Sequence, residues 1–80
     1  MPYATSVMVT TDNGERALAP GEVAIRYSDK MQRWVAVSVE PRRARVLECS
    51  CAWSDGNAID EAAVAFGVDA ERVIVDLKYV

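Results

Sequence analysis

The chain has 80 residues, with 9 Lys or Arg, 12 Asp or Glu and no His, so its formal net charge is -3. This length fits a single domain of residues 1–80 and leaves no room for a second core. The content of 51% hydrophobic and 26% charged residues excludes a disordered chain, and no apolar run approaches the ~20 residues that span a bilayer.

Period-two alternation of apolar and polar residues dominates residues 5–53 and predicts a series of β-strands. A first strand over residues 5–11 leads into Asn13 and Gly14, a pair that favours a hairpin turn because both residues accept positive φ. The next segment, residues 15–19, fits either a short return strand or a helical turn. Further strands are expected over residues 22–28, 33–40 and 45–53.

The pattern changes to helical spacing after the loop that ends at Asn57. Apolar residues then follow one stripe of a helix: Ile59, Ala62, Ala63 and Phe66. We expect a helix over residues 58–66, with Asn57 as its N-cap and Gly67 as a left-handed stop. Alternation returns in a final strand over residues 72–79.

These elements predict an α+β fold, with an antiparallel β-meander of four to five strands, one helix packed on one face, and a last strand that returns to the sheet. Odd-numbered positions form the more apolar side of the expected strands from residue 22 onward. We therefore expect the odd-numbered side chains to cover the helix and the even-numbered ones to form the second face of the sheet.

Large apolar residues also occur at even-numbered positions, where a solvated face would be polar. Trp34 is the largest of them, and Met8 and Ile74 are expected on the same face. Trp and Met are enriched in interface cores, whereas scattered apolar residues on a surface need no special explanation. The pattern favours a contact surface centred on Trp34, either for a partner or for a homodimer formed through the second sheet face.

Charge is distributed unevenly along the chain. Positions 55 to 71 contain no Lys or Arg but five acidic residues: Asp55, Asp60, Glu61, Asp69 and Glu71. An acidic surface formed by these residues would suit a basic protein partner, although a solvated helix face has the same composition. Three arginines, Arg42, Arg43 and Arg45, cluster instead at an expected hairpin turn, which is either a solvated turn or a weak nucleic-acid site. Direct binding of nucleic acid is the less favoured interpretation because the domain is acidic.

The composition does not favour catalysis or a cofactor. Without His there is no Ser–His or Cys–His pair, and the glycines form no phosphate-binding loop. Cys49 and Cys51 are expected to be buried thiols, the alternatives being a redox pair or half of a zinc site completed in a dimer. Because zinc needs four ligands, we expect no metal site. Because the chain lacks a nucleophile–base pair and a phosphate-binding loop, we also expect no cofactor and no enzymatic activity.

The N-terminal residues 1–4 show neither the basic region nor the apolar core of a signal peptide. With two cysteines and no disulfide framework, the chain is expected in a reducing cytoplasm.

Two resemblances extend this interpretation. The stretch from Cys49 to Ala62 resembles the strand-to-helix passage of HicB-type antitoxins, where a loop with Gly and Asp leads into an acidic pair and Ala. We interpret it as a shared sheet-on-helix design. In size, charge, absence of His and order of elements, the chain is similar to small phage-encoded anti-CRISPR proteins. This similarity implies a non-catalytic inhibitor whose acidic residues, or the face around Trp34, contact a host protein.

We therefore expect a small protein-binding module, a phage or mobile-element inhibitor that acts by steric occlusion of a basic nucleic-acid-handling complex in the host cytoplasm. A dimeric antitoxin-like or regulatory domain that associates through its sheet is the alternative. A weak nucleic-acid binder that uses the turn at residues 42–45 is a further alternative.

Overall fold

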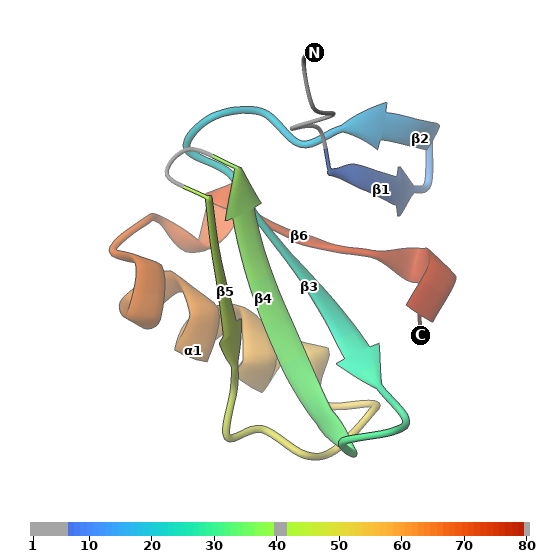
Figure 1. The fold of residues 1–80 in the computed structure, drawn as a ribbon, viewed down its shortest axis with the longest axis vertical. Coiled ribbons are helices and arrows are strands. Elements are labelled where there is room, and N and C mark those ends of the chain that lie inside the picture. Colours follow the sequence, from blue (N-terminus) through green and yellow to red (C-terminus); the bar gives the residue numbers. More distant parts are fainter. Residues whose placement is uncertain (1–6, 40–41, 80) are drawn as a thin grey trace, which may run out of the picture.

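The computed structural model describes residues 7–39 and 42–79 and shows an α+β fold with two sheets and one helix (Figure 1). Its strands are β1 Met8–Thr11, β2 Gly14–Ala17, β3 Val23–Ser28, β4 Arg33–Val39, β5 Arg42–Val46 and β6 Val73–Val75. The helix α1 spans Asp55–Phe66, and the short 3₁₀ helices η1 and η2 span Ala70–Arg72 and Leu77–Tyr79. The predicted fold class is confirmed.

The main sheet contains four strands in the order β5-β4-β3-β6. The β3–β4 and β4–β5 pairs are antiparallel, and β6 returns to the sheet parallel to β3. The open question over residues 15–19 is settled in favour of a strand, because β2 pairs with β1 in a hairpin that forms a second, two-stranded sheet. The first two residues of the expected strand over residues 5–11, and residue 40 of the expected strand over residues 33–40, lie outside the described residues.

The helix begins earlier than expected and ends where expected. Ser54 occupies the N-cap position, so the prediction that Asn57 caps the helix is wrong. Gly67 has φ of 68° and ends the helix in a left-handed conformation, which Gly adopts easily because it has no Cβ. The Gly67 N–H donates to the Val64 carbonyl at 3.3 Å and the Val68 N–H to the Ala63 carbonyl at 3.0 Å.

The last strand is shorter than the expected span of residues 72–79. Only Val73–Val75 pairs with β3, and the chain then turns into η2. The carboxylate of Asp76 accepts a hydrogen bond from the Lys78 N–H at 3.2 Å. Local bonds of this kind stabilise a turn in competition with an extended strand.

The length of the β3–β4 turn decides which side chains share a face. Ser28 pairs with Arg33, so four residues lie between the partners, and odd-numbered residues of β3 stand opposite even-numbered residues of β4. Tyr27 therefore lies opposite Trp34, on the side that covers α1. The prediction of a common odd-numbered helix side is wrong for β4, and Trp34 is fully buried instead of exposed on the second face. The main core comprises Val23, Ile25, Trp34, Ala36, Leu47, Ala58, Ala62 and Val73.

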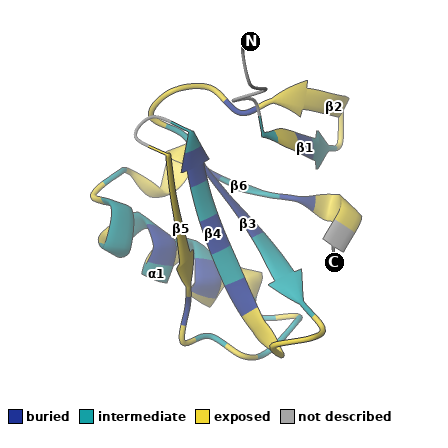
Figure 2. Cartoon of the chain, in the orientation of Figure 1, coloured by how far each residue is buried: buried dark blue, intermediate teal, exposed yellow. Residues whose placement is uncertain are grey.

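The β1–β2 hairpin covers part of the second face of the main sheet (Figure 2). Val9 and Leu18 are buried against Ala24 of β3. Asp76 connects the hairpin to the main sheet. Its side chain is only 1% exposed, and its Oδ1 accepts a hydrogen bond from the Thr10 N–H at 3.2 Å. The second face is thus a partly covered surface rather than an open one.

A second attachment joins the hairpin to the segment that precedes β3. The guanidinium of Arg16 donates two hydrogen bonds to the carboxylate of Glu22, at 2.8 and 3.0 Å, and the Ala19 N–H adds a third at 2.9 Å. The hydrogen bonds from Arg16 hold the pKa of Glu22 below its ordinary value, and the same contact raises the pKa of Arg16. The pair therefore stabilises the fold while the carboxylate is ionised.

The strand β5 forms an edge of the main sheet and differs from its prediction. The expected strand over residues 45–53 is wrong, since β5 spans Arg42–Val46 and residues 47–54 form a loop. All five residues of β5 are exposed (Figure 2). Its arginines therefore lie along an edge strand and not at a hairpin tip, and like charges on an edge oppose pairing with a second copy.

Candidate functional site

The loop of residues 47–54 is held in place by two aromatic side chains of the sheet. The Nε1–H of Trp34 donates to the Cys51 carbonyl at 2.8 Å, and the Tyr27 hydroxyl donates to the Ser50 carbonyl at 3.0 Å. The two rings pack edge to face with their centroids 5.7 Å apart. Trp34, which we predicted as a contact residue, therefore positions this loop from within the core.

The carboxylate of Glu61 connects the same loop to α1. Its Oε2 accepts a hydrogen bond from the Glu48 N–H at 2.6 Å, and its Oε1 accepts one from the Cys49 N–H at 3.0 Å. Hydrogen bonds to an ionised carboxylate are stronger than those between neutral groups. Glu61 thus supports the loop, and a substitution there alters the loop as well as the surface charge.

This supported loop presents Trp53 to solvent. Its side chain is 85% exposed, and Val64 on α1 is 84% exposed. Asp60 lies one helical turn before Val64, so the two share the outer face of the helix. Asp55 is exposed at the start of the helix, but it is half a rotation from Val64, on the side of the buried Ala58 and Ala62. We call Trp53, Asp60 and Val64 the α1 outer surface.

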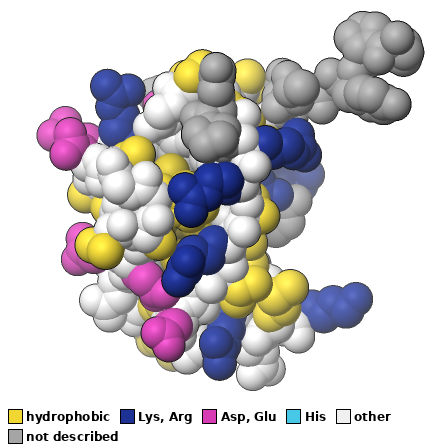
Figure 3. Space-filling model, turned by 60° about the vertical axis from the view of Figure 1, so that its left-hand side comes forward, with side chains coloured by type: hydrophobic (Ala, Val, Ile, Leu, Met, Phe, Trp, Pro, Cys, Tyr) yellow, Lys and Arg dark blue, Asp and Glu magenta, His cyan; other side chains and the backbone are white. Residues whose placement is uncertain are grey.

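The α1 outer surface combines two exposed apolar residues, Trp53 and Val64, with the acidic Asp60, which lies between them in the sequence. Val64 lies nine positions after Asp55, the first residue of the helix, or about 14 Å along the helix axis. Figure 3 shows acidic side chains gathered on one flank of the molecule, while most basic ones lie over its middle and opposite flank. Acidic side chains thus predominate on that flank, although Arg45 lies beside Asp60 and Glu61.

The remaining predicted acidic residues lie elsewhere. Asp69 and Glu71 are exposed, but they follow Gly67 at the far end of the helix. The Asp69 carbonyl accepts a hydrogen bond from the Arg72 N–H at 2.9 Å, which closes the turn of η1. Of the five acidic residues, Asp60 is the one on the α1 outer surface.

The residues predicted around Trp34 are not brought together on an open face. Met8 lies on β1 and is 52% exposed, whereas Ile74 on β6 is partly buried where the hairpin packs on the sheet. Because Trp34 is buried on the other side of the sheet, no common contact surface of these three residues exists.

The three arginines of β5 also point to different surroundings. The guanidinium of Arg43 lies over the ring of Phe66, 4.9 Å from its centroid. Arg42 and Arg43 line one hollow together with Val37, whereas Arg45 lines another beside Asp60 and Glu61. Two of the three arginines therefore share a surface, and Arg45 lies apart from them among acidic residues.

Cys49 and Cys51 are free and half-buried, and they lie in the loop rather than in a strand. The prediction that they are buried strand residues is wrong. Within residues 7–39 and 42–79, no group of three or more Cys, Asp or Glu side chains is arranged to hold a metal ion. In the same part of the chain, no helix is both long enough and apolar enough to cross a membrane.

Two residues of the α1 outer surface were missed at the sequence level. Trp53 falls at an odd-numbered, inward position of the expected strand over residues 45–53, but β5 ends at Val46. Val64 lies on the side of the helix opposite the apolar stripe, so its exposure could have been predicted from the helical spacing of the sequence.

Comparison with models of protein families gave no match, and neither curated proteins nor solved structures matched the chain.

Proposed function

We propose that this chain is a non-enzymatic protein-binding module that docks on its partner through the α1 outer surface. The observation that carries the proposal is Trp53, which is 85% exposed on a loop held by Trp34, Tyr27 and Glu61. Exposed aromatic residues are frequent binding hot spots, and a supported loop loses little conformational entropy on binding.

The chemistry of the surface specifies the partner. Trp53 and Val64 require apolar pockets on the partner, and Asp60 requires a Lys or Arg beside them. Asp55, exposed at the start of the helix, would add a further acidic contact at its edge. Proteins that bind nucleic acid present basic surfaces to phosphate groups. We propose that the module occupies such a surface and so inhibits a nucleic-acid-handling complex by steric occlusion, as expected of a phage or mobile-element inhibitor.

The two alternative functions have less support. A dimer through the second sheet face would have to form beside the hairpin, which packs on that face at Ala24 and Ile74. Nucleic-acid binding at β5 could not use Trp34 to stack a base, because Trp34 is buried.

Site-specific crosslinking tests the docking surface. A photoreactive amino acid in place of Asn57, which is exposed on the helix face of Asp60 and Val64, leaves Trp53 intact. It is expected to crosslink a basic nucleic-acid-binding protein in cells that contain the partner. The same group in place of Met8, which is exposed on the hairpin, serves as the control and should not crosslink that protein. Equal crosslinking from both positions, or none from position 57, would contradict the proposal.

Binding measurements with the purified partner make the test quantitative. Trp53→Ala and Asp60→Lys are each expected to weaken binding, by about 2 kcal/mol for the aromatic anchor. Met8→Ala and Asp12→Lys change exposed residues of the hairpin and should leave the affinity within about 0.5 kcal/mol. Nucleic acid should compete with the module for its partner. Unchanged affinity of Trp53→Ala would refute the assigned surface.

A further inference from the structure

The outer side of β5 is an open edge of the main sheet. In the described part of the chain, β5 pairs with β4 alone, and all five of its residues are exposed. Figure 1 shows β5 at the margin of the sheet. The opposite edge is formed by the three residues of β6, and Asp76, which follows them, accepts a hydrogen bond from the hairpin. β5 is therefore the longer free edge to which another strand could add.

The direction of the backbone groups along β5 follows from a hydrogen bond at its end. The Leu47 N–H donates to the Trp34 carbonyl at 2.8 Å, so the backbone groups of Leu47 face β4. Successive residues of a strand alternate in this direction. The groups of Arg45 therefore also face β4, whereas those of Ala44 and Val46 face away from it. Among the described residues, none forms a hydrogen bond with these outward groups.

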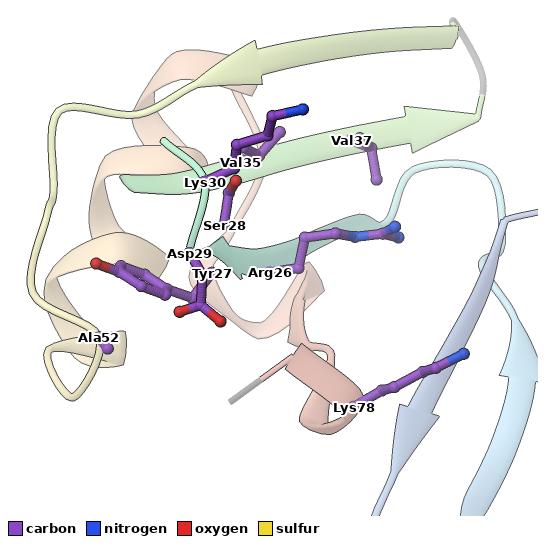
Figure 4. Close-up of a pocket in the computed structure, with 9 residues that line it drawn as sticks. All are labelled: Arg26, Tyr27, Ser28, Asp29, Lys30, Val35, Val37, Ala52 and Lys78. Carbon is purple, nitrogen blue, oxygen red and sulfur yellow. The ribbon is translucent and has the colours of Figure 1, made fainter. Parts of the chain in front are cut away.

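An aliphatic surface accompanies the outward backbone groups. Ala44 and Val46 stand opposite Val37 and Val35 of β4, which line a hollow on the second face of the sheet (Figure 4). The side chain of Val46 is 45% exposed at this edge. An added strand would therefore find both hydrogen-bonding groups and an aliphatic neighbour here.

Uncompensated positive charge lies at the other end of β5. Arg42 and Arg43 line a hollow whose lining contains no Asp or Glu, and within residues 7–39 and 42–79 neither arginine forms an ion pair. The guanidinium of Arg43 lies over the Phe66 ring, a stacking that leaves its N–H groups directed sideways to donate. Arg45 lies among acidic residues of another hollow and adds no excess charge.

We propose that the outer edge of β5 binds an extended acidic segment of a partner protein as an additional antiparallel strand. Five residues of the segment match β5. Its first and third residues, which are aliphatic, stand opposite Val46 and Ala44 and exchange backbone hydrogen bonds with them. Its fourth and fifth residues, which are acidic, stand opposite Arg43 and Arg42. In this mode of recognition the main-chain hydrogen bonds supply affinity and the alternating side chains supply specificity.

The same features distinguish this occupant from a second copy of the chain and from nucleic acid. An antiparallel pair of β5 strands centred on Ala44 would place Arg43 of one copy opposite Arg45 of the other, and like charges in this position oppose pairing. Acidic residues convert this repulsion into attraction. The outward edge alternates donors and acceptors, which match a peptide backbone, whereas phosphate groups only accept hydrogen bonds.

Fluorescence anisotropy with the full chain tests the charged end of the edge. The probe is a labelled peptide with the core Val-Thr-Val-Glu-Glu, compared with Val-Thr-Val-Lys-Lys and an oligothymidine. The Lys peptide should bind at least about tenfold more weakly, because two attractive pairs become repulsive. Arg42→Gln/Arg43→Gln should weaken binding of the Glu peptide about tenfold, since each exposed ion pair contributes up to about fivefold. The matched control Arg33→Gln/Arg72→Gln removes the same charge from exposed residues elsewhere and should change the affinity less than about twofold.

Methylated peptides test the strand pairing without any change to the protein. N-methyl groups on the two Val amides, which face β5 in the proposed pairing, should weaken binding more than about tenfold. N-methyl groups on the amides of Thr and the first Glu face solvent and should change the affinity less than about twofold. Ala44→Pro removes an outward N–H of the edge and should also weaken binding.

Three outcomes would overturn the proposal. They are equal losses from the two methylation patterns, equal binding of the Glu and Lys peptides, and equal losses in the β5 and control double variants. Tighter binding of the oligothymidine would replace the peptide by nucleic acid as the occupant and would overturn the proposal as well. Trp53→Ala should not affect this assay, so its outcome is independent of the proposed docking of α1.

Discussion

Trp34 offers the sharpest test of the fold, because its burial reverses its predicted role. The change Trp34→Phe keeps an aromatic ring on Tyr27 but removes the Nε1–H that donates to the Cys51 carbonyl. Loss of this hydrogen bond costs about 1 kcal/mol. The smaller ring buries about three fewer heavy atoms, which costs roughly 2 kcal/mol at ~0.8 kcal/mol per methylene equivalent.

The sum of about 3 kcal/mol is large for a domain of this size. At roughly 0.05–0.15 kcal/mol per residue, the whole chain is stable by about 4–12 kcal/mol. Trp34→Phe should therefore lower the free energy of unfolding in urea by about 3 kcal/mol and the Tm by roughly 12–24 °C. Trp34→Glu would bury a carboxylate in the main core, and we expect it to prevent folding.

The control for this experiment is the second tryptophan of the chain. Trp53→Phe changes a side chain that is 85% exposed and should alter the free energy of unfolding by no more than about 0.5 kcal/mol. In that variant the remaining indole is buried, so its fluorescence should shift to longer wavelength on unfolding. A folded Trp34→Glu variant, or a loss below about 1 kcal/mol in Trp34→Phe, would refute the buried role of Trp34.

Three further changes test the attachments of the hairpin and the end of the helix. Asp76→Ala removes the acceptor of the Thr10 N–H and should cost about 2 kcal/mol in urea unfolding, so a loss below about 0.5 kcal/mol would contradict its fastening role. Glu22 has a lowered pKa in the fold, so its contribution to stability is present above the ordinary value of 4.5 and is lost as the pH falls through the folded value. The difference in Tm between Glu22→Gln and the parent protein should therefore shrink in acid, and a constant difference would exclude this linkage. Gly67→Ala places a Cβ at φ of 68° and should lower the free energy of unfolding by about 1–2 kcal/mol. The control Gly56→Ala within α1 should raise the free energy of unfolding slightly, because Ala favours a helix. Equal effects of the two changes would refute the left-handed C-cap at Gly67.

The helix was predictable from local sequence, because its signals act over one or two turns. Apolar spacing from Ile59 to Phe66 identified its buried side, and Gly67 identified its end. Its start was missed because Asn57 is a common cap residue, whereas the structure caps the helix at Ser54 without a side-chain hydrogen bond.

The faces of the strands were harder to predict, because they depend on turn length and not only on alternation. Both sides of β4 are apolar, with Trp34 and Ala36 on one side and Val35 and Val37 on the other. The alternation of residues alone therefore does not show which side of β4 faces the helix. A turn with an even number of residues pairs odd positions with even ones, and this rule applied to residues 29–32 would have placed Trp34 in the core.

The candidate site depended on the same long-range information. Trp53 is exposed because β5 ends at Val46 and the following loop leaves the sheet. Hydrogen bonds to Glu61 on α1 and to Trp34 on β4 hold that loop in place. These contacts join residues at least 12 positions apart. No local pattern in the sequence encodes them, so the site emerged only with the tertiary structure.

The attachment of the β1–β2 hairpin has a consequence for the motions of the molecule. The hairpin belongs to a sheet of its own. Within the described part of the chain, it is joined to the rest of the molecule by the packing of Val9 and Leu18, the Thr10–Asp76 hydrogen bond and the pairing of Arg16 with Glu22. Such a unit opens cooperatively at a lower free energy than global unfolding. Hydrogen exchange should therefore release the hairpin amides as one group before those of β3 and β4, and limited proteolysis should cut first between the hairpin and the main sheet.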